Sequence, residues 1–159
     1  MIKGKAALVT GAGSGIGAMA AQRLAAEGAS VAVVDINRDG AEAIAARIKA
    51  AGGTAIALTG NVASTADNEQ VFAAAEEAFG GLDMAFLNAG ILQPYVPFDQ
   101  VSEEVFDRVL AVNLKGVFLG LQQAHKRLRP GGAAVVTASA GINGQAQLVD
   151  AALLSAFPD

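Results

Sequence analysis

Short apolar segments alternate with longer amphipathic segments along most of the chain. Five segments are predicted to be buried strands because they are almost uninterrupted in apolar residues: 6–9, 31–34, 54–58, 82–87 and 133–137. The residues between them repeat at helical spacing over about 18–27, 37–51, 64–79 and 102–129. Alternating strands and helices predict an α/β fold with a doubly wound parallel sheet of the Rossmann type, because right-handed crossovers place helices on both faces. We expect the strand order 3-2-1-4-5.

Polar residues mark the ends of these elements. Ser64, with Asp67 three residues later, is predicted to cap one helix, and Ser102 is predicted to cap the last. The segment 91–100 contains two prolines and is predicted to be a loop. Residues 109–121 are apolar on nearly every face, which predicts a helix that is buried or lies in an interface.

Composition narrows the class of protein. The chain has 159 residues, which predicts one domain over 1–159, and 53% of them are hydrophobic against 16% charged. The net charge of −4 and the scattered Lys and Arg residues disfavour nucleic-acid binding. No apolar run is long enough to span a membrane and no leader precedes the first strand, so we expect a soluble, cytoplasmic protein. Without cysteine and with one histidine, no metal site is expected.

The most informative segment is the glycine turn, residues 11–17, which joins the first strand to the first helix. Glycine adopts positive φ in a tight turn and lets the backbone approach a ligand closely. The free N–H groups at the start of a helix attract anions. The turn therefore predicts a phosphate-binding site.

Asp35 follows the second strand at about the spacing expected for a carboxylate that accepts hydrogen bonds from a ribose diol. The alternative is that Asp35 only caps the next helix. Asn61, the segment 88–90 and Ser139 also follow predicted strands. Because parallel strands end at one edge of the sheet, we expect all of these residues and the glycine turn to meet there, at the switch point between strands 1 and 4.

These motifs resemble those of the short-chain dehydrogenase/reductase family over about residues 3–145. The family's T-G-x-x-x-G-x-G motif matches 10–17, its N-A-G motif matches 88–90, its mid-helix asparagine matches Asn113 and its catalytic serine matches Ser139. The resemblance implies a nicotinamide-dependent oxidoreductase that transfers a hydride between the cofactor and a small alcohol or ketone. It assigns catalysis to Ser139 and Asn113, and cofactor binding to Gly11, Ser14, Gly15, Ile16, Gly17, Asp35, Ile36, Asn61, Val62, Asn88, Ala89 and Gly90.

In this resemblance Asn61 and Val62 lie along the adenine, although most relatives have aspartate in place of Asn61. Asp35 favours NAD over NADP, because a carboxylate would repel a ribose 2′-phosphate. Relatives that use NADP often have a basic residue where this chain has Ser14 or Ile36, whereas Arg38 lies further along the chain.

The family's catalytic tyrosine and lysine, one helical turn apart, have no counterpart. Counting on from Ser139 at the family's usual spacing reaches Ala152 and Ala156, and 146–159 is an atypical tail. Two hypotheses remain open. The sequence represents part of a longer dehydrogenase and is inactive by itself, or it is a non-catalytic NAD-binding protein with a structural or regulatory role.

The resemblance also predicts a homo-oligomer through the helix around 103–129. Its partner in the family is the helix that carries the tyrosine and lysine. We expect the face around Val109, Val112, Val117 and Leu121 to be left uncovered and to drive self-association.

Overall fold

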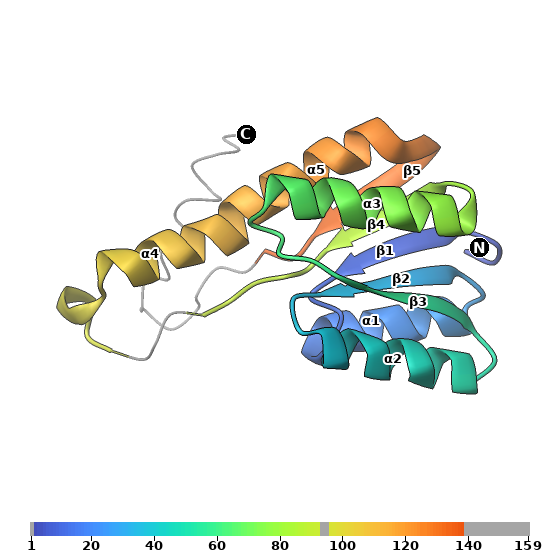
Figure 1. The fold of residues 1–159 in the computed structure, drawn as a ribbon, viewed down its shortest axis with the longest axis horizontal. Coiled ribbons are helices and arrows are strands. Elements are labelled where there is room, and N and C mark those ends of the chain that lie inside the picture. The colour runs from blue at the N-terminus through green and yellow to red at the C-terminus, as the bar shows by residue number, and fades with distance from the viewer. Residues whose placement is uncertain (1, 93–95, 139–159) are drawn as a thin grey trace.

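A computed structural model describes residues 2–92 and 96–138, and these form one parallel sheet with helices on both faces (Figure 1). The five strands lie in the order β3-β2-β1-β4-β5, as the sequence predicts. Their bounds are β1 (Ala6–Thr10), β2 (Ser30–Asp35), β3 (Thr54–Thr59), β4 (Leu82–Leu87) and β5 (Leu128–Val136). The order reverses at β1, whose neighbours are β2 and β4. This is the expected switch point.

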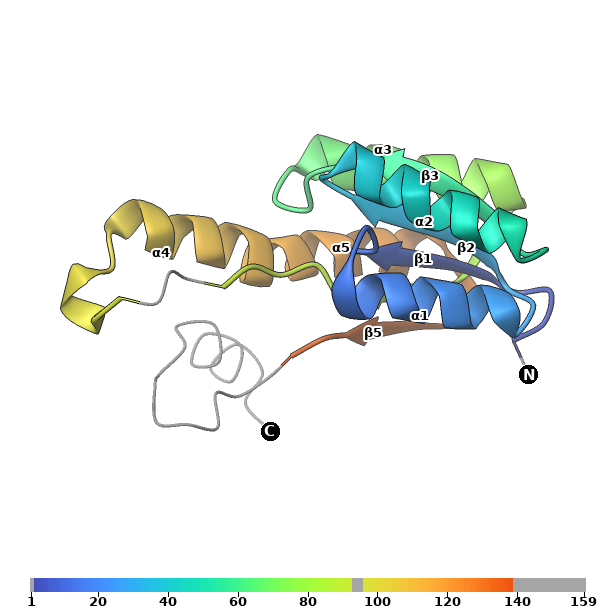
Figure 2. The same ribbon diagram turned by 90° about the horizontal axis from the view of Figure 1, so that it is seen from below.

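The helices form a layer on each face of the sheet. α1 (Gly15–Ala26) and α2 (Arg38–Ala50) cover one face, and α3 (Thr65–Phe79) and α5 (Gly116–Arg127) cover the other (Figure 2). A 3₁₀ turn, η1 (Phe98–Gln100), precedes α4 (Glu103–Leu110), and the π-helical segment η2 (Ala111–Lys115) joins α4 to α5. Figure 1 shows α4 extending beyond the sheet, as the far end of one long helix.

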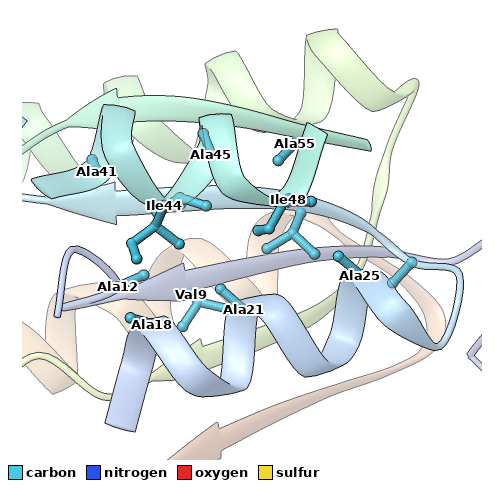
Figure 3. Close-up of a cluster of buried hydrophobic side chains, with 13 residues drawn as sticks. Val9, Ala12, Ala18, Ala21, Ala25, Ala41, Ile44, Ala45, Ile48 and Ala55 are labelled. Atoms are coloured by element: carbon cyan, nitrogen blue, oxygen red, sulfur yellow. The ribbon is translucent and has the colours of Figure 1, made fainter. Parts of the chain in front are cut away.

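Alanine sets the spacing of the layer formed by α1 and α2. α1 packs on the sheet through Ala18, Ala21 and Ala25, and α2 contributes Ile44 and Ile48 to the same cluster (Figure 3). Because alanine has only a methyl side chain, the helix backbone lies close to the strands, and the longer isoleucines fill the space above β2 and β3. The opposite cluster contains larger residues, with Phe72 of α3 fully buried against the sheet.

The predicted cap of α3 is confirmed. Ser64 Oγ accepts a hydrogen bond from the N–H of Asp67 at 3.2 Å, and it donates to Asp67 Oδ1 at 2.8 Å. Asn37 caps α2 in the same way, accepting from the N–H of Gly40. The helix is therefore capped by Asn37, and the alternative that Asp35 is the cap is wrong.

The last predicted helix and strand need correction. The sequence pattern predicts one regular helix to about residue 129 and a strand only from residue 133, but α5 ends at Arg127 and β5 begins at Leu128. Leu128 pairs with Leu82, and the next pair, Met84 with Ala133, lies beyond an irregularity in register. The Pro130-Gly131-Gly132 segment, which predicts a helix end, is accommodated in this bulge.

A buried carboxylate holds that bulge. Asp83 accepts hydrogen bonds from the Ala6 N–H at 2.9 Å, from Lys5 Nζ at 3.0 Å and from Arg129 Nη1 at 3.1 Å. Burial of the Asp83 carboxyl raises its pKa. The hydrogen bonds from Ala6 and Lys5, and the charges of Lys5 and Arg129, outweigh that effect and hold the pKa below its usual value. Arg129 is thereby tied to β4, which explains why the strand starts before the glycines.

Candidate functional site

A cleft of about 650 Å³ opens at the carboxyl ends of the strands, where the sequence predicts a site. This volume is in the range of small-molecule and cofactor sites. Its lining consists of Gly11, Ser14, Gly15, Ile16, Val34, Asp35, Ile36, Gly60, Asn61, Val62, Asn88, Ala89, Gly90, Ile91, Leu92, Val112, Asn113, Thr137 and Ala138. Among them, Ile16, Ile36 and Leu92 are each more than 65% exposed, so apolar side chains surround the mouth of the cleft.

At two positions of the glycine turn there is no room for a Cβ atom. Gly11 has φ +63°, and a Cβ there would lie 2.8 Å from the Cα of Ala89. A Cβ at Gly17 would overlap the carbonyl oxygen of Gly11. The glycines therefore allow the turn to pack against the segment after β4 and allow α1 to pack against the turn.

The first turn of α1 remains open to a ligand. Ser14 is the N-cap residue, but its side chain makes no capping hydrogen bond, whereas α2, α3 and α4 each have a side-chain cap. No acidic residue lies in the first turn of α1. The N–H groups and positive end of the helix dipole thus face the cleft without a capping side chain or an acidic residue in the first turn, which suits a phosphate group.

Asp35 links the glycine turn to the end of β2. Its Oδ2 accepts a hydrogen bond from the N–H of Gly13 at 2.8 Å, and its Oδ1 accepts from the N–H of Asn37 at 2.9 Å. A Cβ at Gly13 would lie 2.9 Å from the Asp35 carboxyl carbon. Each carboxylate oxygen has a second lone pair, so Asp35 can hold the turn and at the same time accept a hydrogen bond from a ligand hydroxyl.

The segment after β3 forms a second wall. Asn61 Oδ1 accepts from the N–H of Ala63 at 3.0 Å, and the N–H of Asn61 donates to Asp67 Oδ2 at 2.9 Å. That backbone hydrogen bond, followed by the one from the Ser64 hydroxyl, lowers the pKa of Asp67. The carboxylate of Asp67 is therefore ionised at neutral pH. It lies in the first turn of α3 and holds the segment after β3 in place through the N–H of Asn61.

The segment after β4 forms the opposite wall and is tied to its neighbours on both sides. Thr10 Oγ1 accepts hydrogen bonds from the N–H groups of Asn88 at 3.0 Å and Ala89 at 3.2 Å. Asn88 Oδ1 accepts from Thr137 Oγ1 at 2.9 Å, after β5. Asn88 thus connects the ends of β1, β4 and β5.

Asn113 lies in the π-helical segment and pairs with the backbone of Ile91. Its Oδ1 accepts from the Ile91 N–H, and its Nδ2 donates to the Ile91 carbonyl, both at 2.8 Å. Both polar groups of this half-buried amide therefore have a backbone partner. A π turn interrupts the regular helical hydrogen bonds and occurs often at functional sites.

The structure brings most of the predicted site residues together. All the predicted cofactor-binding residues line the cleft except Gly17, which packs behind the turn. Ser139 and the positions of the family's missing tyrosine and lysine, Ala152 and Ala156, lie outside the described residues. Seven further lining residues were not predicted as site residues: Val34, Gly60, Ile91, Leu92, Val112, Thr137 and Ala138. Their signal was positional, because Val34 precedes Asp35, Val112 adjoins Asn113 and the other five follow strands.

Residues 2–92 and 96–138 give no sign of a membrane span or a metal centre. No helix in these ranges is both long and apolar enough to cross a membrane. Within the same ranges, no group of three or more His, Asp or Glu side chains is placed to hold a metal ion.

Comparison with known proteins identifies the family to which this fold belongs. The model of the short chain dehydrogenase family matches residues 5–152. Levodione reductase of Leifsonia aquatica is 41% identical over 140 residues, which cover 86% of this chain and 52% of the relative. The chain spans about half the length of the curated relatives that it matches.

Solved structures agree with this assignment. A short chain dehydrogenase from Burkholderia cenocepacia in complex with NADP superposes with a TM-score of 0.88 and 37% identity, covering 97% of this chain and 66% of that one. A 3-ketoacyl-(acyl-carrier-protein) reductase from Brucella melitensis complexed with NADH also gives 0.88, with 31% identity, covering 98% and 68%. The matched family model includes every residue that lines the cleft, and the chain belongs to the short-chain dehydrogenase family.

Proposed function

We propose that the cleft binds NAD and that the protein of which this cleft is part transfers a hydride between the nicotinamide and an alcohol or carbonyl substrate. The observation that carries the proposal is the joint placement of the glycine turn, Asp35 and the two walls around one cleft at the strand ends. The uncapped start of α1 provides N–H groups for the pyrophosphate. The exposed apolar side chains at the mouth provide surfaces for the two flat rings.

The charge at Asp35 supports NAD rather than NADP. Two like charges 4 Å apart interact by about 1 kcal/mol in water and about 4 kcal/mol at an effective dielectric constant near 20. A 2′-phosphate beside this carboxylate would therefore bind less well than two free hydroxyls. The relatives with solved structures include one complex with NADP and one with NADH, so the preference is argued from Asp35.

The bound cofactor would supply the hydride donor or acceptor. Asp35 would accept hydrogen bonds from the ribose hydroxyls, and Asn61 and Val62 would contact the adenine. Asn113 would fix the wall at Ile91 through its two hydrogen bonds. In the family, proton transfer to the substrate requires the tyrosine and lysine, and no tyrosine or lysine follows Ser139 in these 159 residues. We therefore propose that this chain by itself binds NAD without turnover.

Calorimetric titration with NADH, followed by a hydride-transfer assay with small alcohols and ketones, tests this proposal. We expect NADH to bind and no alcohol or ketone to be converted. Absence of NADH binding would contradict the proposed cleft, and turnover by this chain would contradict the assignment of proton transfer to the missing pair.

The second candidate is a non-catalytic NAD-binding protein with a structural or regulatory role. The observation that favours it is the same absence of tyrosine and lysine beside a well-formed cleft. The two candidates differ in whether the reading frame continues beyond the codon of Asp159. An intact cellular protein of 15.9 kDa favours the second candidate, whereas a longer product that contains the tyrosine and lysine favours the first.

We also propose that the chain self-associates through the long helix, but by a different face from the one expected. Val109 and Val117 are buried, Leu121 is partly buried against the core, and Val112 is half-buried and lines the cleft. The prediction that this face is uncovered is therefore wrong, because the face packs against the rest of the same chain. The exposed apolar residues of this helix are Phe106 and Phe118.

The π turn brings these two phenylalanines into line. At about 100° per residue, they would lie about 120° apart around the axis of an uninterrupted α-helix. A π turn takes up one extra residue, which reduces the offset to about 20°. Half-buried Leu110 and Leu114 lie between them along the chain. We expect light scattering to show a dimer or larger species that a Phe106→Ser, Phe118→Ser variant loses. A monomer at high concentration before substitution would contradict this proposal.

A further inference from the structure

The wall formed by Asn61 and Val62 is held by residues that do not line the cleft. Asn68, in the first turns of α3, is only 2% exposed. Its Nδ2 donates to the carbonyl oxygen of Val62 at 2.6 Å and to that of Ser64 at 2.8 Å. Both N–H groups of one buried amide are thus used to fix the backbone of this wall. Asn68 itself has no contact with the cleft.

Gly116 limits the same wall from the opposite side. It begins α5, is buried, and has φ −59° and ψ −42°, a conformation that any residue can adopt. A Cβ at Gly116 would lie 2.9 Å from Val62 Cγ2 and 3.3 Å from the Val62 carbonyl oxygen. Glycine is therefore required here because a Cβ would clash with Val62, and not because of the backbone conformation. Because valine is β-branched and stiff at χ1, it cannot easily turn its side chain away.

The helix that carries Gly116 also supports the other wall. Asn113 lies three residues before Gly116 and holds the backbone of Ile91. The junction of the π segment and α5 is thus in contact with both walls of the cleft.

We propose that Asn68 and Gly116 are positioning residues that together set Val62 against the adenosine half of the dinucleotide. Asn68 fixes the carbonyl of Val62 from α3, and the missing side chain of Gly116 lets Val62 rest on the backbone of α5. Displacement of Val62 would change the fit of adenine without any change in a residue that touches it. The inference rests on the proposed NAD site.

Gly116→Ala and Gly120→Ala form a matched pair for the test. Gly120 lies on the same face one turn later, and a Cβ there would lie 2.8 Å from Cδ2 of Leu87, which does not line the cleft. Leucine can move its terminal methyl groups by a change of rotamer, whereas Val62 must shift as a whole. Both substitutions add a methyl in a helix, where alanine is favoured over glycine by about 1 kcal/mol. Both variants are therefore expected to fold.

Calorimetric titration with ADP-ribose, which carries the adenosine half without nicotinamide, measures the effect. We expect Gly116→Ala to raise the Kd about 3- to 10-fold, comparable to the net loss of one hydrogen bond. Gly120→Ala should leave the Kd unchanged. In a Val62→Ala background, which removes the clashing methyl groups, the effect of Gly116→Ala should shrink. A role of Gly116 in helix stability alone would not produce this coupling.

Asn68→Ala provides an independent measurement, since it removes the two donors to the wall and should also raise the Kd for ADP-ribose. Unchanged Kd values for Gly116→Ala and Asn68→Ala would overturn the inference and leave the NAD site in place. Equal losses in Gly116→Ala and Gly120→Ala, or an effect independent of Val62, would overturn it as well. Absence of ADP-ribose binding by the unsubstituted chain would contradict the proposed function itself, and the inference with it.

Discussion

Replacement of Asp35 by asparagine separates two roles that this residue combines. Its carboxylate holds the glycine turn through the Gly13 N–H and orients Asn37 through a second backbone hydrogen bond. It also places a negative charge where the adenosine ribose is expected. Asparagine has nearly the same shape but keeps only one acceptor oxygen and no charge.

The two roles predict effects of different sign. Asparagine must direct its NH₂ group at one of the two N–H donors, and the loss of one hydrogen bond to a charged group in a partly exposed site costs about 1–2 kcal/mol. Because the weakened turn must be ordered again when a cofactor binds, we expect NADH and NADPH to bind about 5- to 30-fold more weakly. Removal of the charge relieves about 1–4 kcal/mol of repulsion for NADPH only. The ratio of the NADPH Kd to the NADH Kd should therefore fall by about fivefold or more.

Gly13→Ala is the matched control for Asp35→Asn. Its Cβ would lie 2.9 Å from Asp35 Oδ2, so it disturbs the turn and leaves the charge. Calorimetry should show equal losses of NADH and NADPH affinity for Gly13→Ala and a changed ratio only for Asp35→Asn. If Asp35→Asn weakens both cofactors equally, Asp35 acts through the turn alone, and its proposed selectivity for NAD is refuted.

Three further substitutions test the framework of the site. Thr10→Val removes the acceptor of two backbone N–H groups after β4, and we expect the free energy of unfolding in urea to fall by about 2–4 kcal/mol. Asn113→Ala leaves the N–H and carbonyl of Ile91 without partners, which should cost about 1–3 kcal/mol in the same assay and weaken NADH binding. Asp83→Asn tests a pH effect. The pKa of Asp83 is depressed in the folded chain, so its stabilisation is present above the unfolded pKa near 3.9 and is lost as pH falls through the folded pKa. The variant should therefore lose stability at pH 7 and show a shallower fall below about pH 4.

Each of these expectations has a clear opposite. Unchanged stability of Thr10→Val would mean that water replaces the hydroxyl. For Asn113→Ala, intact NADH affinity would show that the Ile91 wall does not depend on the amide. For Asp83→Asn, a free energy of unfolding that falls with decreasing pH as steeply as in the unsubstituted chain would show that other carboxylates govern acid unfolding.

The order of the strands and most of the cleft were predictable because both follow from local patterns. Apolar runs such as 31–34 indicate a strand covered on both faces, and the chain order of strands and helices restricts the topology. Asp35 and Asn61 could be placed at one edge since each follows such a run. The motif at 10–17 then predicted a cofactor site at this edge.

Features that depend on distant partners were not predictable from pattern. The start of β5 at Leu128 depends on the attachment of Arg129 to Asp83, which lies on another strand. Which face of the long helix is covered depends on the π turn, since one extra residue rotates everything after it by about 100°. The support of Val62 by Asn68 and Gly116 comes from two separate helices.

The central claim is that NAD binds in the cleft between the two walls. It is tested most directly by following the backbone amide resonances of the chain during titration with NADH. We expect the largest shifts at Gly13, Gly15, Asn61 and Ala89, with saturation at one equivalent. Shifts confined to other surfaces, such as the smaller cavity between α2 and α3 beside Arg38, or no shifts at all, would contradict the account.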